Sequence, residues 1–154
     1  LNAVRPGIAL YGYSSNGGHH ELLPVMKITT RVLAVRTLPV GTPVSYGRTF
    51  VTKRTTRVAV VSLGYADGFN RLFSNNAEML VRGHRVPVVG RVCMDLTMLD
   101  VTELEHVSEG DEVVVLGSQN GQAIMASELS QRIGTIPYEI LTSLGSRSRK
   151  EYVH

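Results

Sequence analysis

Apolar residues in this chain follow strand-type spacing up to about residue 125 and helical spacing only after it. Residues 26–34, MKITTRVLA, alternate apolar or small side chains with Lys27, Thr29 and Arg31, which is typical of a half-exposed strand. The continuous apolar run at 58–61 is typical of a strand that is buried on both faces. These patterns restrict the chain to a mostly β fold.

Glycine-containing turns separate the strand segments. Asn120-Gly121 lies between EVVVLG and QAIM, and Asn-Gly is the strongest short signal for a two-residue β-hairpin. Gly83-His84 lies between EMLV and RVPVV and predicts a second hairpin with a type II′ turn. Because Pro87 cannot donate a backbone hydrogen bond, it marks the second strand of that hairpin as a sheet edge or a bulge.

Helices are predicted only near the C-terminus. In ASELSQRIG the apolar residues recur at helical spacing, and Gly134 follows as a stop. Thr135 is predicted to cap a second helix within IPYEILTSL, with Pro137 in its first turn. The sequence therefore predicts a mainly β fold, an antiparallel β-barrel-like domain with a small helical corner near the C-terminus.

Size and composition favour one soluble domain. The 154 residues are 43% hydrophobic and 19% charged, which is enough to bury a core. The net charge of +3 is spread along the chain, with only SRSRK at 146–150 clustered, so no nucleic-acid partner is predicted. Cys93 is the single cysteine, and no signal-type or membrane-length apolar run occurs, which favours a cytoplasmic protein without a membrane partner. Because the chain begins at Leu1 rather than at methionine, we expect it to be a piece of a longer protein.

Three short segments carry residues suited to chemistry, although each has an ordinary alternative. In RPGIALYG, at 5–12, the amides of Gly7 and Ile8 could face an anion, or the segment is a plain Pro-Gly turn. In SLGYADGF, Tyr65 lies on a loop that follows a buried strand, where side chains can reach a substrate. In VSYGRTF, Tyr46 is either a half-buried strand aromatic or a residue whose hydroxyl reacts.

Two further groups of residues are less suited to chemistry. Cys93 and Met94, in VVGRVCMD, are ordinarily core-filling residues, and a cysteine nucleophile would need a histidine base that this stretch lacks. His19 and His20 with Glu21 suggest a metal site, but no third or fourth ligand has suitable spacing. A solvated loop is the better interpretation, and no metal is predicted.

Five segments together carry a resemblance to a known family. They are, in order, RPGIALYG, VSYGRTF, SLGYADGF, VVGRVCMD and TIPYE. Each is a weak signal alone, but in this order and spacing they resemble the C-terminal domain of alanine racemase, over essentially the whole chain. The resemblance implies an N-terminal (β/α)8 barrel that carries the lysine binding pyridoxal 5′-phosphate. It assigns residues 1–12 to the tail of that barrel, with a phosphate-binding loop, and residues 13–154 to the C-terminal β domain.

The resemblance implies two catalytic residues. Tyr46 matches the tyrosine that moves the α-proton on one face of alanine, opposite the lysine, and that a homodimer contributes to the partner subunit's site. A phenol ordinarily ionises near pH 10, so a basic tyrosine requires nearby positive charge or strong hydrogen bonds. Arg5 matches an arginine facing the pyridine nitrogen of the cofactor, where a permanently charged donor weakens the electron sink and suppresses transamination.

The resemblance also implies a cofactor set, a substrate set and an entrance corridor. Beside Arg5, the cofactor set comprises the amides of Gly7 and Ile8 and the hydroxyl of Tyr138. The substrate set comprises Met94, whose amide would hold the carboxylate, with Tyr65 and Asp95. The corridor comprises Arg71, Arg91 and Ile136, for each of which a solvated or packing role is the alternative. Lys27, Lys53 and Lys150 match no motif, so the cofactor lysine is expected outside this chain.

Other functions remain open at the level of sequence. The same scaffold could belong to a broad-specificity racemase or a serine racemase, because most of the other wall of the pocket would lie on the barrel. The chain could also be a catalytically silent β module that binds a barrel domain or a second copy. Pyridoxal-phosphate decarboxylases share the barrel-plus-β plan, but VSYG, GYADG and CMD fit racemases better. The expected partners are alanine, the barrel domain and a homodimer partner.

Overall fold

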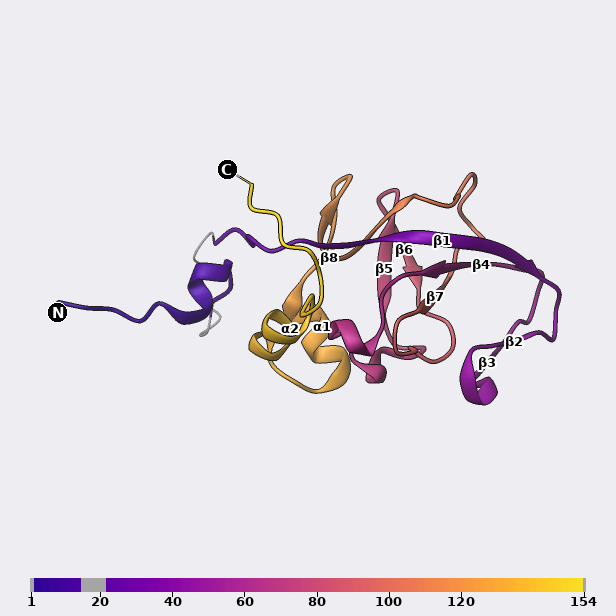
Figure 1. Ribbon diagram of the computed structural model, residues 1–154, viewed down its shortest axis with the longest axis horizontal. Helices are drawn as coiled ribbons and strands as arrows, with labels where there is room; N and C mark the ends of the chain where they lie inside the picture. The colour runs from indigo at the N-terminus through magenta and orange to yellow at the C-terminus, as the bar shows by residue number, and fades with distance from the viewer. Residues whose placement is uncertain (1, 15–21, 154) are drawn as a thin grey trace.

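The computed structural model describes residues 2–14 and 22–153. Within them the chain is mostly β with two short α-helices after residue 125, as the spacing of apolar residues predicts (Figure 1). The strands are β1 Ile28–Leu38, β2 Pro43–Val44, β3 Phe50–Val51, β4 Thr56–Val61, β5 Glu78–Val81, β6 His84–Pro87, β7 Thr97–Asp100, β8 Glu112–Gln119 and β9 Gln122–Ile124. The helices are α1 Ala126–Ile133 and α2 Pro137–Ser143, with 3-10 turns η1 Gly7–Tyr11, η2 Tyr46–Arg48, η3 Tyr65–Asp67 and η4 Arg71–Phe73.

The main sheet is antiparallel and curls toward a barrel. Among the described residues its strand order is β6-β5-β8-β1-β4-β7, with β9 paired to β8. The two ends of this order meet after β6, where Val88 bridges Leu99 of β7 and the amide of Val89 donates to the carbonyl of Met98 at 2.9 Å. The barrel-like prediction is therefore confirmed, although a bridge rather than a full ladder joins the edges.

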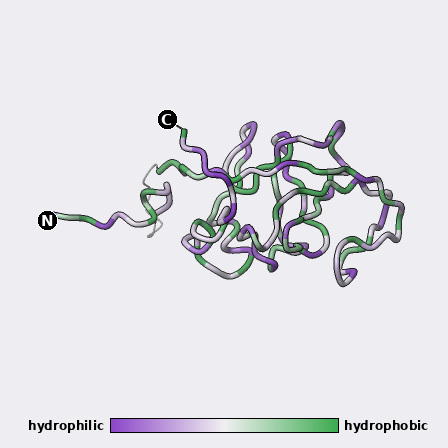
Figure 2. The backbone as a smooth tube through the Cα atoms, viewed as in Figure 1, coloured by the Kyte–Doolittle hydropathy of each residue, from purple (hydrophilic) through white to green (hydrophobic). Residues whose placement is uncertain are grey.

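The strand interiors supply one main hydrophobic core. β4 lies between β1 and β7 and is buried along most of its length, as its continuous apolar run predicts. β1 alternates exposed and partly buried residues up to a register shift between Val32 and Ala34. Figure 2 shows hydrophobic segments along the strands and hydrophilic residues in the C-terminal tail. Phe69 and Phe73 stack at 4.6 Å between ring centroids and anchor the segment after β4 in this core.

The structure confirms one hairpin turn and corrects the other. Asn120 and Gly121 have φ of 49° and 80°, the type I′ geometry that joins β8 to β9. In the β5-β6 hairpin the turn residues are Arg82 and Gly83, with φ of 54° and 83°, not Gly83-His84. The turn is therefore type I′, because Val81 pairs with His84 and this register places His84 in the strand. β6 lies at the edge of the strand order, as Pro87 predicts.

The helical corner follows the prediction except at one cap. Gly134 ends α1 with φ of 71°, and Pro137 is the first residue of α2. Thr135 is not the N-cap of α2; Ile136 occupies that position in extended conformation, and no side chain caps the helix. The hydroxyl of Thr135 instead hydrogen-bonds the carboxylate of Glu139.

The N-terminal segment packs against the helical corner. The side chain of Ile8 is buried in the main core, and the hydroxyl of Tyr13 accepts the amide N–H of Ala126 at 3.2 Å. In Figure 1 this segment lies at one end of the long axis of the molecule, whereas β2, β3 and the adjoining turn η2 lie at the other. Residues of η1 and η2 are therefore far from each other within one chain.

Candidate functional site

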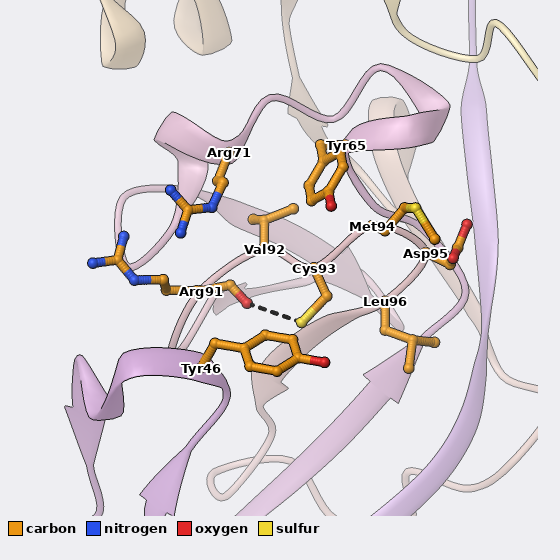
Figure 3. Close-up of a pocket in the computed structure, with 9 residues that line it drawn as sticks. All are labelled: Tyr46, Tyr65, Arg71, Arg91, Val92, Cys93, Met94, Asp95 and Leu96. Atoms are coloured by element: carbon orange, nitrogen blue, oxygen red, sulfur yellow. Dashed lines mark hydrogen bonds between the residues drawn. The ribbon is translucent and has the colours of Figure 1, made fainter.

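An open pocket of about 520 Å³ lies beside η2 (Figure 3). Its lining residues are Tyr46, Tyr65, Arg71, Arg91, Val92, Cys93, Met94, Asp95 and Leu96. They come from η2, η3, η4 and the segment that connects β6 to β7. The pocket thus brings together Tyr46, Tyr65, Arg71 and the group Arg91, Met94 and Asp95, which come from three separate regions of the sequence.

Tyr46 projects from a strained turn. Ser45 has φ of 63° and ψ of −174°, a backbone region that is essentially restricted to glycine. Gly47 and Arg48 also have positive φ, so both neighbours of Tyr46 and the next residue deviate from ordinary backbone geometry. Such conformations cost about 1–3 kcal/mol each in residues other than glycine and persist only where the surrounding structure holds them. The turn leaves Tyr46 with 74% of its surface exposed, and Tyr46 begins a 3-10 turn, which together exclude the half-buried strand aromatic.

Contacts with the segment at 90–93 hold this turn. The hydroxyl of Ser45 donates to the carbonyl oxygen of Arg91 at 2.7 Å, and Cys93 Sγ lies 3.4 Å from the same hydroxyl. A Cβ on Gly90 would lie 2.7 Å from the carbonyl oxygen of Val44, so only glycine allows the two segments to approach this closely. Cys93 is half-buried at this contact, which places its thiol beside the turn as well as in the pocket lining.

The loops that carry Tyr65 and Met94 are joined by backbone hydrogen bonds. The amide of Tyr65 donates to the carbonyl of Cys93, and the amide of Ala66 donates to the carbonyl of Met94, both at 3.0 Å. A Cβ on Gly64 would lie 2.3 Å from the carbonyl oxygen of Met94. Glycine at this position therefore permits the close approach that fixes Tyr65 relative to Met94.

Met94 lines the pocket and has a backbone amide without a partner in the described part of the chain. It lies outside the helices and strands, and its amide has no acceptor among residues 2–14 and 22–153. The neighbouring amide of Cys93 donates to the carbonyl of Leu96 at 2.9 Å, across the bend formed by Met94 and Asp95. The Met94 N–H is therefore left without an acceptor within the described residues.

One side of the pocket carries positive charge that the described residues leave unpaired. Within the described part of the chain, neither Arg71 nor Arg91 has a carboxylate within ion-pair distance. Figure 3 shows their guanidinium groups on one side of the pocket and Asp95 on the other.

Asp95 is paired with Arg147, which joins two loops of the site. The Arg147 guanidinium donates to Asp95 Oδ1 at 2.6 Å and to Asp67 Oδ1 at 3.0 Å. Asp67 also accepts the amide of Gly64 at 2.9 Å. The hydrogen bond to Asp95, followed by that to Asp67, raises the pKa of Arg147. The C-terminal segment therefore links the loop of Tyr65 to the loop of Met94.

A second hollow of about 430 Å³ adjoins the first. It shares Tyr65 and Arg71 with the pocket and is otherwise lined by Gly68, Asn70, Glu139 and Ser143. Tyr65 and Arg71 therefore each line both hollows.

The residues expected to hold a cofactor lie elsewhere. Arg5 is exposed and Gly7 begins η1, with φ of 56° and open space where a Cβ would stand. Ile8 has its side chain in the core, which leaves only its backbone for a ligand. Tyr138 in the first turn of α2 is half-exposed, and Ile136 before it is exposed. None of these five residues lines the pocket beside Tyr46.

Two residues of the site escaped the sequence interpretation. Ser45 lies inside the VSYG motif, but its anchoring contact is 46 residues away in sequence. Arg147 appears in the sequence only as part of the basic cluster SRSRK, and its partner Asp67 is 80 residues away. No local pattern could reveal either contact.

Other site types have no support in the described residues. Within 2–14 and 22–153 no cluster of three potential metal ligands occurs, whereas His19, His20 and Glu21 lie outside these ranges. In the same ranges no helix has the length and hydrophobicity to cross a membrane. Lys27 forms an ion pair with Glu112 at 3.1 Å on the sheet surface.

Sequence comparisons agree on one family. Residues 25–152 match the family described as alanine racemase, C-terminal domain. An alanine racemase of Thermodesulfovibrio yellowstonii is 53% identical over 153 residues, covering 99% of this chain and 41% of that protein. Alanine racemase 2 of Caldanaerobacter subterraneus subsp. tengcongensis is 49% identical, covering 100% of this chain and 40% of that protein. The chain thus spans about two-fifths of the length of the curated relatives that it matches.

Solved structures show the same similarity. Alanine racemase from Bartonella henselae with covalently bound pyridoxal phosphate superposes with a TM-score of 0.89 at 39% identity, covering 96% of this chain and 40% of that chain. Alanine racemase from Bacillus anthracis with bound L-Ala-P gives a TM-score of 0.83 at 38% identity, covering 90% of this chain and 36% of that chain.

Proposed function

Because the chain belongs to the alanine racemase family, as its C-terminal domain, we propose that it forms one wall of a site that interconverts L- and D-alanine. The observation that carries this proposal is the pocket in which Tyr46 and Tyr65 flank the loop of Met94. Racemisation removes the α-proton on one face of the substrate and returns a proton on the other. The exposed phenol of Tyr46 is the group of this chain that performs the proton transfer on one face.

The pocket that Tyr46 lines also carries positive charge. Arg71 and Arg91 carry positive charge that no carboxylate among the described residues neutralises, and both line the pocket with Tyr46. A guanidinium remains protonated throughout the physiological range, so this charge attracts an anionic group of a substrate. The negative charge of Asp95 is paired with Arg147 and does not cancel it.

The amide of Met94 is suited to the carboxylate of the amino acid. It has no acceptor among the described residues, and the hydrogen bond between the neighbouring Cys93 and Leu96 fixes the turn that carries it. A backbone N–H that donates to a charged acceptor forms a short and strong hydrogen bond. Met94 therefore orients the substrate in the pocket that Tyr46 also lines, and the identity of the Met94 side chain matters less than the loop geometry.

The cofactor-binding part of this chain fits a phosphate group. Gly7 has positive φ and an open flank, and the first amides of η1 have no partner within that turn. Gly7, Ile8 and the hydroxyl of Tyr138 would hold the phosphate of pyridoxal 5′-phosphate, and Arg5 would face its pyridine nitrogen. When bound, the cofactor supplies the electron sink that makes the α-proton of alanine acidic. The similar Bartonella henselae enzyme, with covalently bound pyridoxal phosphate, supports this assignment.

The separation of the two residue sets supports a site made by two chains. The N-terminal segment with η1 lies at one end of the long axis, whereas η2, which begins at Tyr46, adjoins β2 and β3 at the other (Figure 1). A single copy cannot bring both sets to one substrate. We propose that Tyr46, Tyr65 and Met94 complete the cofactor site of a homodimer partner, which also requires the lysine-bearing barrel.

Selectivity for alanine rests on the space beside Tyr65. Tyr65 lines both hollows, and with Tyr138 it would limit the substrate side chain to about a methyl group. Discrimination by size is modest, about 1–3 kcal/mol per methylene. A serine or broad-specificity racemase is the alternative, and relative kcat/KM values for alanine and serine distinguish them.

Replacing Tyr46 by phenylalanine tests the proposal in the complete enzyme, formed by this chain and its cofactor-bearing barrel. We expect turnover of L-alanine to fall about 10²- to 10⁴-fold with cofactor content unchanged, since only the proton carrier is lost. Tyr152→Phe is the matched control, because Tyr152 is exposed in the C-terminal tail and outside the pocket. Equal loss of cofactor and turnover, or unchanged turnover, contradicts the proposed role of Tyr46.

The chain alone provides a second test. Without the barrel it should neither bind pyridoxal phosphate covalently nor racemise alanine, whereas adding a separately expressed barrel domain should restore D/L interconversion. A stoichiometric lysine adduct trapped by borohydride on this chain would contradict the assignment of the cofactor lysine to the barrel. Persistent inactivity of a well-folded complex would favour the silent-module alternative.

A further inference from the structure

We propose that Ser45 is a positioning residue, whose side-chain hydrogen bond to the backbone of the 90–93 segment fixes where the phenol of Tyr46 stands. This inference rests on the proposed function for its catalytic consequence. Its structural part, the restraint of the 45–48 turn, stands on the geometry alone.

The phenol of Tyr46 has little else to hold it. Tyr46 is 74% exposed, and its hydroxyl has no hydrogen-bond partner in the described part of the chain. The position of the phenol therefore depends on the backbone that carries it. That backbone is unusual, because positive φ at Ser45, Gly47 and Arg48 surrounds Tyr46.

Ser45 supplies the restraint that this backbone needs. With φ of 63° and ψ of −174° it occupies a region that glycine adopts freely and other residues avoid. A chain that needed only this conformation would be served better by glycine. Serine adds a hydroxyl that donates to the Arg91 carbonyl at 2.7 Å and lies 3.4 Å from Cys93 Sγ. The hydrogen bond of the Ser45 side chain therefore offsets the backbone strain that serine has at this position.

The partner of this hydrogen bond belongs to the same pocket. Arg91 precedes the turn of Met94 by three positions, and Gly90 lacks the Cβ that would lie 2.9 Å from Ser45 Cβ. The contact thus sets the turn of Tyr46 against the segment whose amide is proposed to hold the substrate. A shift of about 1 Å between a proton carrier and its substrate can reduce the rate about 100-fold.

Two substitutions at this position separate positioning from stability. Ser45→Ala loses the hydrogen bond and keeps the strained backbone, whereas Ser45→Gly loses the hydrogen bond and relieves the strain. Ser45→Gly should therefore be the more stable of the two by thermal unfolding. If the hydroxyl positions Tyr46, both variants should lose kcat by about 10- to 100-fold, and glycine should recover none of it. If Ser45 is merely structural, activity will follow stability and Ser45→Gly will keep the activity of the unmodified protein.

A matched control removes the same type of bond elsewhere. Ser130 lies in α1 and its hydroxyl donates to the carbonyl of Ser127 at 2.8 Å, outside the pocket. Ser130→Ala should leave kcat and the turn at 45–48 unchanged. A loss of kcat in this variant equal to that of Ser45→Ala would overturn the inference.

The closing experiment combines two readouts on the complete enzyme. Amide hydrogen exchange of residues 46–48 should become about tenfold faster in Ser45→Ala and Ser45→Gly, because their anchor is gone; unchanged exchange overturns the inference whatever the activity. The deuterium isotope effect should rise for α-deuterated L-alanine and not for D-alanine, because only the face served by Tyr46 is affected. An equal rise for both enantiomers overturns the positioning role. Faster exchange together with a fully active Tyr46→Phe enzyme would mean that the proposed function fails while the structural restraint holds.

Discussion

Gly64→Ala is the substitution whose effect follows most directly from the geometry of the site loops. Gly64 has φ of −150°, an extended conformation open to any residue, so alanine causes no backbone strain there. In open space this exchange would stabilise the protein by about 0.4–1 kcal/mol, because alanine restricts the unfolded chain. The space is closed, since the new Cβ would lie 2.3 Å from the Met94 carbonyl oxygen and 2.4 Å from that of Cys93.

These distances determine how much stability Gly64→Ala should lose. Real Cβ contacts do not fall below 3.0 Å, so the Met94 carbonyl must retreat by at least about 0.7 Å. The retreat weakens the hydrogen bonds from Tyr65 to Cys93 and from Ala66 to Met94, both 3.0 Å long. Losing two such bonds costs about 2 kcal/mol, and overpacking adds about 1–3 kcal/mol. We expect a total destabilisation of about 3–5 kcal/mol.

Urea unfolding measures this effect as a lower midpoint with an unchanged slope. Gly41→Ala is the control, because Gly41 has φ of 81° but nothing within 4 Å of the place that a Cβ would occupy, so it reports backbone strain without crowding. That variant should lose only about 1–2 kcal/mol. A neutral or stabilising Gly64→Ala, or one milder than Gly41→Ala, would refute the close approach of the two loops.

Two other substitutions test charged contacts. Arg147→Lys should raise the KM for alanine in the complete enzyme about tenfold with little change in unfolding temperature. The reason is that one ammonium group cannot bind Asp67 and Asp95 at once as the guanidinium does. An unchanged KM would mean that the loops of Tyr65 and Met94 keep their positions without the Arg147 guanidinium. Hydrogen bonds from Arg85 and Arg132 lower the pKa of Glu128 in the folded protein below the unfolded value of 4.5. The stability that Glu128 contributes to the fold is therefore fully present above pH 4.5 and is lost as the pH falls through the lower folded pKa. Glu128→Gln should therefore lower the free energy of unfolding by about 1–2 kcal/mol at neutral pH and make it fall less steeply below about pH 4.5. Urea unfolding at a series of pH values measures both effects. Parallel plots of unfolding free energy against pH for the two proteins would contradict this.

Local patterns predicted the elements of the fold where the signal lies within a few residues. The period-two alternation, the continuous run at 58–61, Asn120-Gly121 and Gly134 each depend on backbone preferences of neighbouring residues, and each appears in the structure. The β5-β6 turn was displaced by one residue, because cross-strand register decided which residues took positive φ. The predicted cap at Thr135 failed because extended Ile136 takes the cap position.

The candidate site divides in the same way. The order of five motifs was sufficient to identify the family, and it named six residues that line the pocket. It could not reveal that Ser45 anchors Tyr46 to the Arg91 carbonyl, or that Arg147 joins two loops.

The sequence by itself determined the β character, most turns and the motifs, since these follow from short-range preferences and residue chemistry. The tertiary structure alone decided that the N-terminal segment with η1 lies at one end of the long axis, whereas β2, β3 and the adjoining turn η2 lie at the other (Figure 1). It also decided which distant side chains meet, because such contacts depend on how the curled sheet brings remote segments together.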